Sequence, residues 1–140
     1  MKIIKGDELN SYPILKKLGV EAWDARGNAR LTPTGRTKVG AVVANTRDDL
    51  IFKGCNIEHS FRSHDIHAEP CAISSLIAAG YKTFDTILIV AERDRFTPCG
   101  SCMDWIMEIG GPKVQVMFQG KPGGDISVYS AEELMPQYPF

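Results

Sequence analysis

The sequence predicts an α/β fold of three layers, α/β/α, in which helices cover both faces of one mixed, five-stranded sheet. The first observation is the alternation of strand-like and helix-like apolar patterns along the chain, which is typical of layered domains. The second is the clustering of glycine and proline between these patterns, where turns are expected. The third is the length of 140 residues, which suits one hydrophobic core, so we predict a single domain over residues 1–140.

An N-terminal helix is expected to end near Arg26. Two starts remain open: Asp7 is a candidate N-cap, whereas Pro13 interrupts the apolar pattern and is tolerated in a first turn. The candidate core residues of this helix are Leu9, Ile14, Leu15, Leu18 and Trp23. The Gly-, Pro- and Thr-rich segment Gly27–Lys38 then predicts a loop, either a solvated basic loop or one border of a binding pocket.

A β-hairpin follows this loop. Val39–Ala44 is a β-branched apolar run that predicts a buried strand, and Leu50–Gly54 is its return strand after a polar turn at Asn45–Asp49. Beyond the hairpin, Asn56 and Glu58 alternate with apolar neighbours, so both side chains should leave one face of an extended segment. An amide beside a carboxylate suits a sugar diol; the alternative is a polar loop that caps the next helix.

Helices and strands alternate over the rest of the chain. Ala68–Ala79 and Cys99–Ile109 have apolar residues at helical spacing, and each run is followed by glycine as a stop signal. Ser130 and Glu133 have the spacing of a capping box for a last short helix. The remaining predicted elements are the strands Thr86–Val90, Val114–Phe118 and Ile126–Tyr129 and the helix Ala131–Met135.

Two short stretches at the starts of predicted helices carry the chemistry: His67-Ala68-Glu69 and Pro98-Cys99-Gly100-Ser101-Cys102. One imidazole and two thiols, from His67, Cys99 and Cys102, are three zinc ligands, and a catalytic zinc keeps three protein ligands and a water. Zinc lowers the pKa of that water to about 7, and Glu69 is placed to carry its proton. The joint spacing H-x-E…P-C-x-x-C is the signature of zinc-dependent deaminases.

A redox or structural role for the C-x-x-C pair is the alternative. A structural zinc site needs four protein ligands, so one more cysteine or histidine would have to join. The candidates for that fourth ligand are Cys55, Cys71, His59 and His64.

Composition narrows the class of partner and the compartment. The formal net charge of −1 argues against a polynucleotide partner, since proteins that hold many phosphates carry a basic surplus. No stretch has the length of a transmembrane helix, and the N-terminus lacks the apolar run of a signal peptide. Four cysteines without disulfide-like spacing fit a reducing compartment, so we expect a cytoplasmic protein.

These motifs resemble the cytidine deaminase family, and the resemblance covers most of the chain from Val39 onward. It is carried by five elements: Val39-Gly40-Ala41, Gly54-Cys55-Asn56-Ile57-Glu58, His67-Ala68-Glu69, Pro98-Cys99-Gly100-Ser101-Cys102 and Ala131-Glu132-Glu133-Leu134-Met135-Pro136. The resemblance implies hydrolytic deamination of a cytosine nucleoside to the uracil nucleoside and ammonia. It also implies a homotetramer, because members of this length usually assemble so, with pockets that borrow residues from neighbouring subunits.

The resemblance also assigns roles to individual residues. It implies that His67, Cys99 and Cys102 bind Zn²⁺ and that Glu69 shuttles the proton. Asn56 and Glu58 would bind the ribose 3′-hydroxyl. The backbone around Ala68 and Cys99 would hold the base.

The chain departs from the family pattern at three positions. Most short members have Cys where His67 stands and Arg where Pro70 stands, and the family commonly has a base-packing Phe where this chain has Thr37. The last departure leaves the base open, and a modified or bulkier cytosine nucleoside, as in the related blasticidin S deaminases, is an alternative to cytidine.

The C-terminal tail resembles the L-P-x-x-F ending of short members, which reaches a neighbouring subunit's pocket. Two prolines fix an extended path here, and the tail carries two aromatic rings, Tyr138 and Phe140. The resemblance implies that one of them supplies the aromatic wall that Thr37 lacks. Packing of both rings on their own domain is the alternative.

Two further functions remain open. One is deamination of another aminated base, nucleoside or nucleotide, and a nucleotide would need positive charge from Arg26, Arg30 or Arg36. The other is a catalytically inactive, zinc-stabilised binding module.

Overall fold

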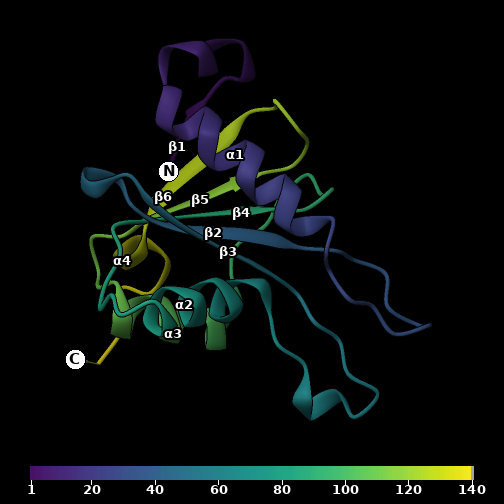
Figure 1. Cartoon of the computed structure of the whole chain (residues 1–140). Helices are drawn as coiled ribbons and strands as arrows, with labels where there is room; N and C mark the ends of the chain where they lie inside the picture. The colour runs from purple at the N-terminus through teal and green to yellow at the C-terminus, as the bar shows by residue number, and fades with distance from the viewer. Residues whose placement is uncertain (140) are drawn as a thin grey trace.

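The computed structural model describes residues 1–139 and shows one six-stranded sheet between two layers of helices (Figure 1). The strands are β1 (Lys2–Ile4), β2 (Gly40–Asn45), β3 (Leu50–Cys55), β4 (Thr86–Val90), β5 (Gln115–Gln119) and β6 (Ile126–Ser130). The α-helices are α1 (Pro13–Arg26), α2 (Ala68–Ala78), α3 (Gly100–Ile109) and α4 (Ala131–Leu134). Three short 3₁₀ helices cover Gly6–Ser11, Thr46–Asp48 and Arg62–His64.

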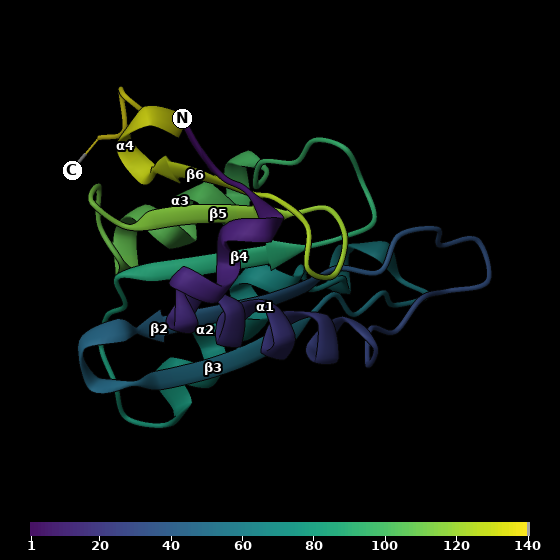
Figure 2. The ribbon, with the colours of Figure 1, turned by 90° about the horizontal axis from the view of Figure 1, so that it is seen from above.

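The sheet is mixed, as the sequence predicts. Its strand order is β1-β6-β5-β4-β2-β3; β4 and β5 run parallel, and every other neighbouring pair is antiparallel. Figure 2 shows this order from β6 to β3, with α1 on the near face and α2 and α3 on the far face. The parallel pair is linked through α3, the crossover that parallel neighbours require.

Each face of the sheet has its own hydrophobic core, which confirms the three-layer prediction. Val43 and Ile87 point toward the core formed with α2, α3 and α4, whereas Val42 and Leu88 point toward the core formed with α1. This alternation follows from the two-residue period of a strand. Strands covered on both faces explain why β2 and β4 read as continuous apolar runs.

The prediction of five strands was one short, because β1 was missed. β1 has only three residues, and its register against β6 pairs Ile3 with Ser127. Ile4 is buried, but Ile3 is 48% exposed, so the segment lacks a strong apolar pattern of its own. Pairing with β6, more than 120 residues away, therefore decides its conformation.

The N-terminal helix begins at Pro13, so Asp7 is not its N-cap. Asp7 lies in the separate 3₁₀ helix Gly6–Ser11, and Pro13 occupies the first α-helical turn, where the missing amide costs nothing. Of the candidate core residues, Leu9 and Leu18 are buried and Leu15 and Trp23 are partly buried. Ile14 was placed wrongly, since it is 48% exposed.

The other elements match their predicted positions within one or two residues. The capping box is confirmed, because the Ser130 hydroxyl accepts from the Glu133 amide and the Glu133 carboxylate accepts from the Ser130 amide. Gly54 lets α2 lie directly on β3, since a Cβ there would collide with the Ala72 amide nitrogen. Among residues 1–139, no helix combines the length and apolar character needed to cross a bilayer.

Candidate metal centre and substrate pocket

Three donor side chains meet between the first residues of α2 and α3. His67 is the N-cap of α2 and Cys99 the N-cap of α3, with Cys102 one turn further along α3. His67 Nδ1 lies 3.3 Å from Cys102 Sγ and 3.5 Å from Cys99 Sγ, and the two sulfurs are 3.5 Å apart. Both helices begin here because each ligand motif precedes an apolar helical run.

This donor set fits a zinc ion. Zn–S bonds of about 2.3 Å and Zn–N bonds of about 2.0–2.1 Å, at tetrahedral angles, separate ligand atoms by about 3.5–3.8 Å. The three observed separations are within a few tenths of an ångström of that range. Among residues 1–139, His67, Cys99 and Cys102 form the one group of three or more metal-ligating side chains.

Glu69 lies next to this group, in the first turn of α2, and is only 2% exposed. Burial raises the pKa of its carboxyl above the ordinary value. Burial likewise raises the pKa of the Cys102 thiol, and the neighbouring Glu69 and Cys99 raise it further. Burial and the neighbouring Glu69 both disfavour the Cys102 thiolate, and a bound cation compensates its charge, which is a second reason that the site suits a divalent metal.

A cavity of about 520 Å³ opens onto the donor group. Its inner end is lined by His67, Ala68, Glu69 and Cys99, of which Ala68 is fully buried. Its other walls come from the segment after β3, the loop between α1 and β2, and the loop between β4 and α3. The first two of these segments project from the same end of the sheet (Figure 1).

Asn56 lines the cavity and is anchored to the loop that precedes β2. Its Oδ1 accepts a 2.8 Å hydrogen bond from the Val39 amide, and its Nδ2 donates a 2.9 Å bond to the Thr37 carbonyl. The side chain therefore holds Thr37 to Val39 in place, and its second Nδ2 hydrogen has no protein acceptor among residues 1–139.

Glu58 lines the cavity as well, and it too is anchored to the loop. Its Oε1 accepts hydrogen bonds from the amide and hydroxyl of Thr32, at 2.9 and 3.0 Å. Its Oε2 lies 3.8 Å from Arg62 Nη2. Gly35 allows this close packing, because a Cβ at that position would collide with Glu58 Oε1. The segment from Gly27 to Lys38 is thus a pocket border rather than a free loop.

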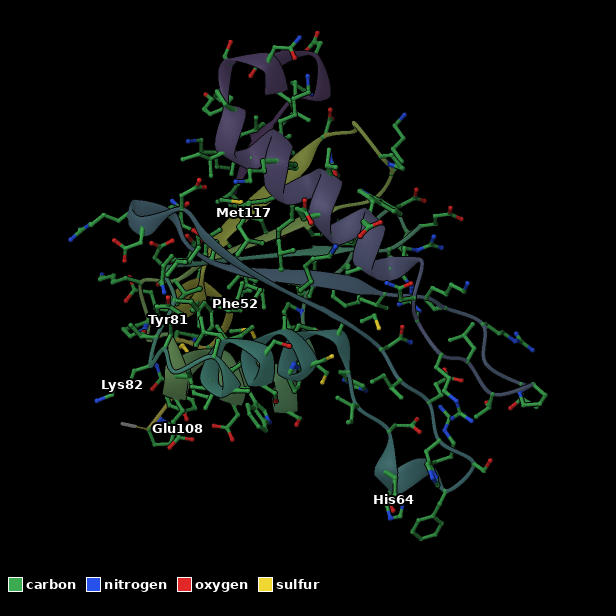
Figure 3. All side chains as sticks on the ribbon, viewed as in Figure 1. Phe52, His64, Tyr81, Lys82, Glu108 and Met117 are labelled. Carbon is green, nitrogen blue, oxygen red and sulfur yellow. The ribbon has the colours of Figure 1, made fainter. Side chains whose placement is uncertain are left out.

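The remaining cysteines and histidines lie outside the donor group. Cys55 and Cys71 are half-buried, and burial raises the pKa of the Cys55 thiol. His59 and His64 pack against each other in the loop after β3, with ring centroids 4.9 Å apart and the ring planes tilted by 59°. Figure 3 shows His64 on this projecting loop, away from α2 and α3. Within residues 1–139, the group contains three protein ligands and no fourth. A catalytic zinc site has this number, because its fourth position is kept for water.

Tyr138 packs on its own chain. Its ring lies against the core that contains α2 and α3, and its hydroxyl donates a 2.6 Å hydrogen bond to Asp104 on α3, which raises the pKa of Tyr138 to about 12. It is not among the residues that line the cavity. Phe140 lies outside the described residues, so the predicted contribution of the tail to a neighbouring pocket stays a prediction.

Several cavity residues were missed in the sequence, among them Phe96, Arg93 and Arg62. Phe96 lines the cavity from the loop between β4 and α3 and stacks on Phe118, with ring centroids 5.3 Å apart. It supplies, within one chain, an aromatic wall of the kind that Thr37 does not. Phe96 lies three residues before Cys99, and this proximity to a metal ligand could have indicated its place in the cavity. Nothing in the sequence around Arg93, on the same loop, indicated that it lines the cavity.

Of the three arginines considered for a phosphate, only Arg36 lines the cavity. Arg30 donates a 2.5 Å hydrogen bond to the Glu58 carbonyl, and Arg26 bonds the Lys38 carbonyl and lies 3.7 Å from Glu92. Arg26 and Arg30 therefore hold the loop to its neighbours instead of facing the cavity.

Comparison with known proteins agrees with this site. Residues 15–118 match the family model described as the cytidine and deoxycytidylate deaminase zinc-binding region. The chain is 31% identical to a cytidine deaminase of Sporosarcina psychrophila over 123 residues, which are 87% of this chain and 88% of the relative. It is 33% identical to a probable cytidine deaminase of Dictyostelium discoideum over 106 residues, which are 74% of this chain and 69% of the relative.

A crystal structure of cytidine deaminase from Burkholderia pseudomallei has the same fold, with a TM-score of 0.77 and 34% identity. The match covers 86% of this chain and 95% of that structure. The matched segment contains the donor group and Glu69. The chain belongs to the cytidine deaminase family, and its cofactor is zinc.

Proposed function

We propose that this protein hydrolyses a cytosine nucleoside to the uracil nucleoside and ammonia. The observation that carries the proposal is the buried carboxyl of Glu69 beside the three-donor group, at the inner end of a cavity large enough for a nucleoside. Asn56 and Glu58 on a neighbouring wall support a sugar-bearing substrate rather than a free base.

His67, Cys99 and Cys102 hold the metal in this proposal. When bound, zinc supplies an acidified water, with a pKa of about 7, at neutral pH. Glu69 accepts a proton from this water and delivers it to N3 of the cytosine ring. After addition of the water oxygen at C4, Glu69 passes the second proton to the amino group, and the C4–N bond breaks to release ammonia. The raised pKa of a buried carboxyl suits a group that must both accept and release protons near neutral pH.

The remaining contacts orient the nucleoside. In this proposal, the second Nδ2 hydrogen of Asn56 and the carboxylate of Glu58 bind the ribose 3′-hydroxyl as donor and acceptor. The backbone at Ala68 and Cys99 holds the base, with Phe96 as its aromatic neighbour. Because Asn56 and Glu58 also anchor the loop, the sugar-binding groups are fixed before the substrate arrives.

The decisive experiment is ammonia release from a panel of cytidine, deoxycytidine, methylcytidine, cytosine, adenosine and guanine by the zinc-loaded protein. We expect the cytosine nucleosides to react and free cytosine to react poorly. Ammonia from guanine or adenosine in preference to any cytosine nucleoside would contradict the proposal, and no ammonia from any compound would identify an inactive binding module.

The sugar contacts have a separate test. Replacing both Asn56 and Glu58 with Ala should raise KM for a nucleoside much more than for the free base. Equal effects on both would show that these residues do not read the sugar.

We further propose that residues 1–140 act as one catalytic domain within a homotetramer in the cytoplasm. Ile66, Ile77 and Trp105, on and beside α2 and α3, are each at least 40% exposed, and apolar side chains of this kind are typical of surfaces covered by another subunit. All four cysteines are free thiols, which suits a reducing compartment. Light scattering after size-exclusion chromatography tests the assembly, since a monomeric mass would contradict it.

A further inference from the structure

Three arginine side chains line the rim of the cavity, and they come from three different segments. Arg36 lies in the loop between α1 and β2, Arg62 in the 3₁₀ helix Arg62–His64, and Arg93 just after β4. A neutral nucleoside offers no charge for any of them to bind. The charges already present around each arginine therefore decide whether it is available to a ligand.

Arg62 is engaged. Its Nε donates a 2.8 Å hydrogen bond to Asp65 Oδ2, and its Nη2 lies 3.8 Å from Glu58 Oε2. Two carboxylates thus neutralise this guanidinium, and it fixes the loop after β3.

Arg36 and Arg93 have no such carboxylate. The Arg36 side chain makes no hydrogen bond or ion pair with residues 1–139, and Arg93 makes only a 3.2 Å hydrogen bond from Nη2 to Thr37 Oγ1. A guanidinium has five donor hydrogens, so most of the donors on both side chains are unused. Both side chains are exposed to solvent and reachable from the cavity.

The acids in the cavity do not cancel this charge. Glu69 is buried beside the metal donors, and Glu58 is occupied by Thr32 and Arg62. The bond from Arg93 to Thr37 also joins the loop between β4 and α3 to the residue that follows Arg36. The two available guanidinium groups therefore come from two loops that are in direct contact.

We propose that Arg36 and Arg93 form a subsite for an anionic group carried by the sugar of the substrate, a phosphate or a carboxylate. The inference rests on the proposed deamination of a cytosine nucleoside and narrows its substrate class to cytosine nucleotides or sugar-carboxylated cytosine nucleosides. The planar fork of arginine matches phosphate and carboxylate oxygens in pairs, which makes it the preferred residue for such a subsite. The inner end of the cavity still selects the base.

The test compares kcat/KM of the zinc-loaded protein for cytidine, cytidine 5′-monophosphate and cytidine 5′-carboxylate. Each charge-assisted hydrogen bond contributes roughly 1.5–3 kcal/mol, so wild-type protein should favour one anionic substrate over cytidine by about tenfold or more. The anion with the larger kcat/KM identifies the source of the charge. Added salt should raise KM for that anion and leave KM for cytidine nearly constant.

Arg36→Gln and Arg93→Gln should each lower the ratio of anionic to neutral kcat/KM by about tenfold, mostly through KM. Arg47→Gln is the matched control, because Arg47 is also exposed and without a partner among residues 1–139 but lies in the hairpin turn between β2 and β3, away from the cavity. Arg36→Lys keeps the charge but loses the fork, so it should give an intermediate ratio. Zinc content and circular dichroism confirm that each variant folds.

Two outcomes overturn the subsite: a wild-type protein that prefers cytidine to both anions, or Arg36 and Arg93 variants whose selectivity equals that of Arg47→Gln. A binding measurement distinguishes failure of the subsite from failure of the proposed function. Binding of cytidine and of the two anions to zinc-loaded Glu69→Gln is measured by calorimetry. Tighter, arginine-dependent binding of an anion without turnover in wild-type protein would retain the subsite and refute the deaminase proposal. Turnover of cytidine by a wild-type protein without preference for an anion would retain the deaminase proposal and refute the subsite.

Discussion

Substitution of Glu69 by Gln should abolish most turnover and leave the metal site intact. Gln has almost the same shape and stays neutral, so His67, Cys99 and Cys102 should keep their separations and still bind zinc. An amide cannot accept the proton of the water or pass it to the substrate. The change therefore separates proton transfer from metal binding.

The structure indicates that no other group replaces Glu69. The other carboxylate that lines the cavity is Glu58, whose Oε1 accepts two hydrogen bonds from Thr32 and whose Oε2 faces Arg62. General acid–base catalysis contributes typically about 10²–10⁴-fold, which corresponds to about 2.7–5.4 kcal/mol of barrier. Glu69→Gln should lower kcat by a factor in this range, at one zinc per chain.

The assay is ammonia release at saturating substrate, together with metal analysis of the same sample. Glu92→Gln is a matched control, because Glu92 lies just after β4 and its carboxylate is well exposed outside the cavity. A zinc-loaded Glu69→Gln protein within threefold of wild-type kcat would refute the role of Glu69. Loss of zinc from the variant would instead show that the carboxylate supports the metal.

The same variant makes a prediction about stability in the metal-free protein. Burial raises the pKa of Glu69 above its ordinary value of 4.5, so the folded state disfavours the ionised form. The unfolded chain releases this proton first, and the stability of metal-free wild-type protein should fall as pH rises above about 4.5. Metal-free Glu69→Gln should lack this fall. The measurement is the melting temperature of both proteins from pH 4 to pH 7, and an equal change with pH in the two proteins would contradict the argument.

Four further perturbations test other parts of the molecule. Dialysis against a chelator should abolish activity and zinc return should restore it; activity in a protein shown by analysis to be metal-free would rule out the metal mechanism. His67→Cys should keep zinc but shift the activity profile to higher pH, because three thiolates leave the site at −1 and make the bound water less acidic, so an unchanged or acid-shifted profile would count against this account. Asn56→Ala should lower stability by about 1–3 kcal/mol and raise KM, since it removes the bonds to Val39 and Thr37, and denaturant titration would detect this. Deletion of Tyr138 to Phe140 should leave a folded, zinc-loaded protein with weaker substrate binding and a looser oligomer, whereas wild-type KM and mass would reduce the tail to local packing.

The parts of the fold that the sequence predicted are those with strong local signals. β2 and β4 are continuous apolar runs because helices cover both of their faces, and α2 and α3 have helical spacing that ends at glycine. β1 lacked such a signal, since three residues at the edge of the sheet take their conformation from β6. Similarly, Asp7 has the chemistry of an N-cap, but Pro13 fixes where the α-helix begins.

The candidate site divides in the same way. The metal donors and Glu69 lie within two short motifs, and each motif opens a helix, so the sequence identifies both halves of the centre, while the packing of α2 against α3 brings the halves together. The wall that contains Asn56 and Glu58 depends on contacts between residues far apart in the chain. Asn56 and Glu58 were recognised as polar residues at the pocket, but their bonds to Thr37, Val39 and Thr32 were not, because these depend on how the loop after α1 folds back.

This division explains why the reaction type is easier to read from this chain than the substrate. Reaction type depends on groups that must sit within a few ångströms of one another, and these groups are concentrated in two short motifs at the starts of α2 and α3. In the proposed site, substrate choice is assigned to Arg36, Thr37, Arg93 and Phe96, which line the cavity from two loops that the Arg93–Thr37 hydrogen bond joins. Changes in these two loops can therefore alter the substrate without disturbing the metal, and the absence of an aromatic residue at Thr37 need not weaken base binding when Phe96 forms the wall from the other side.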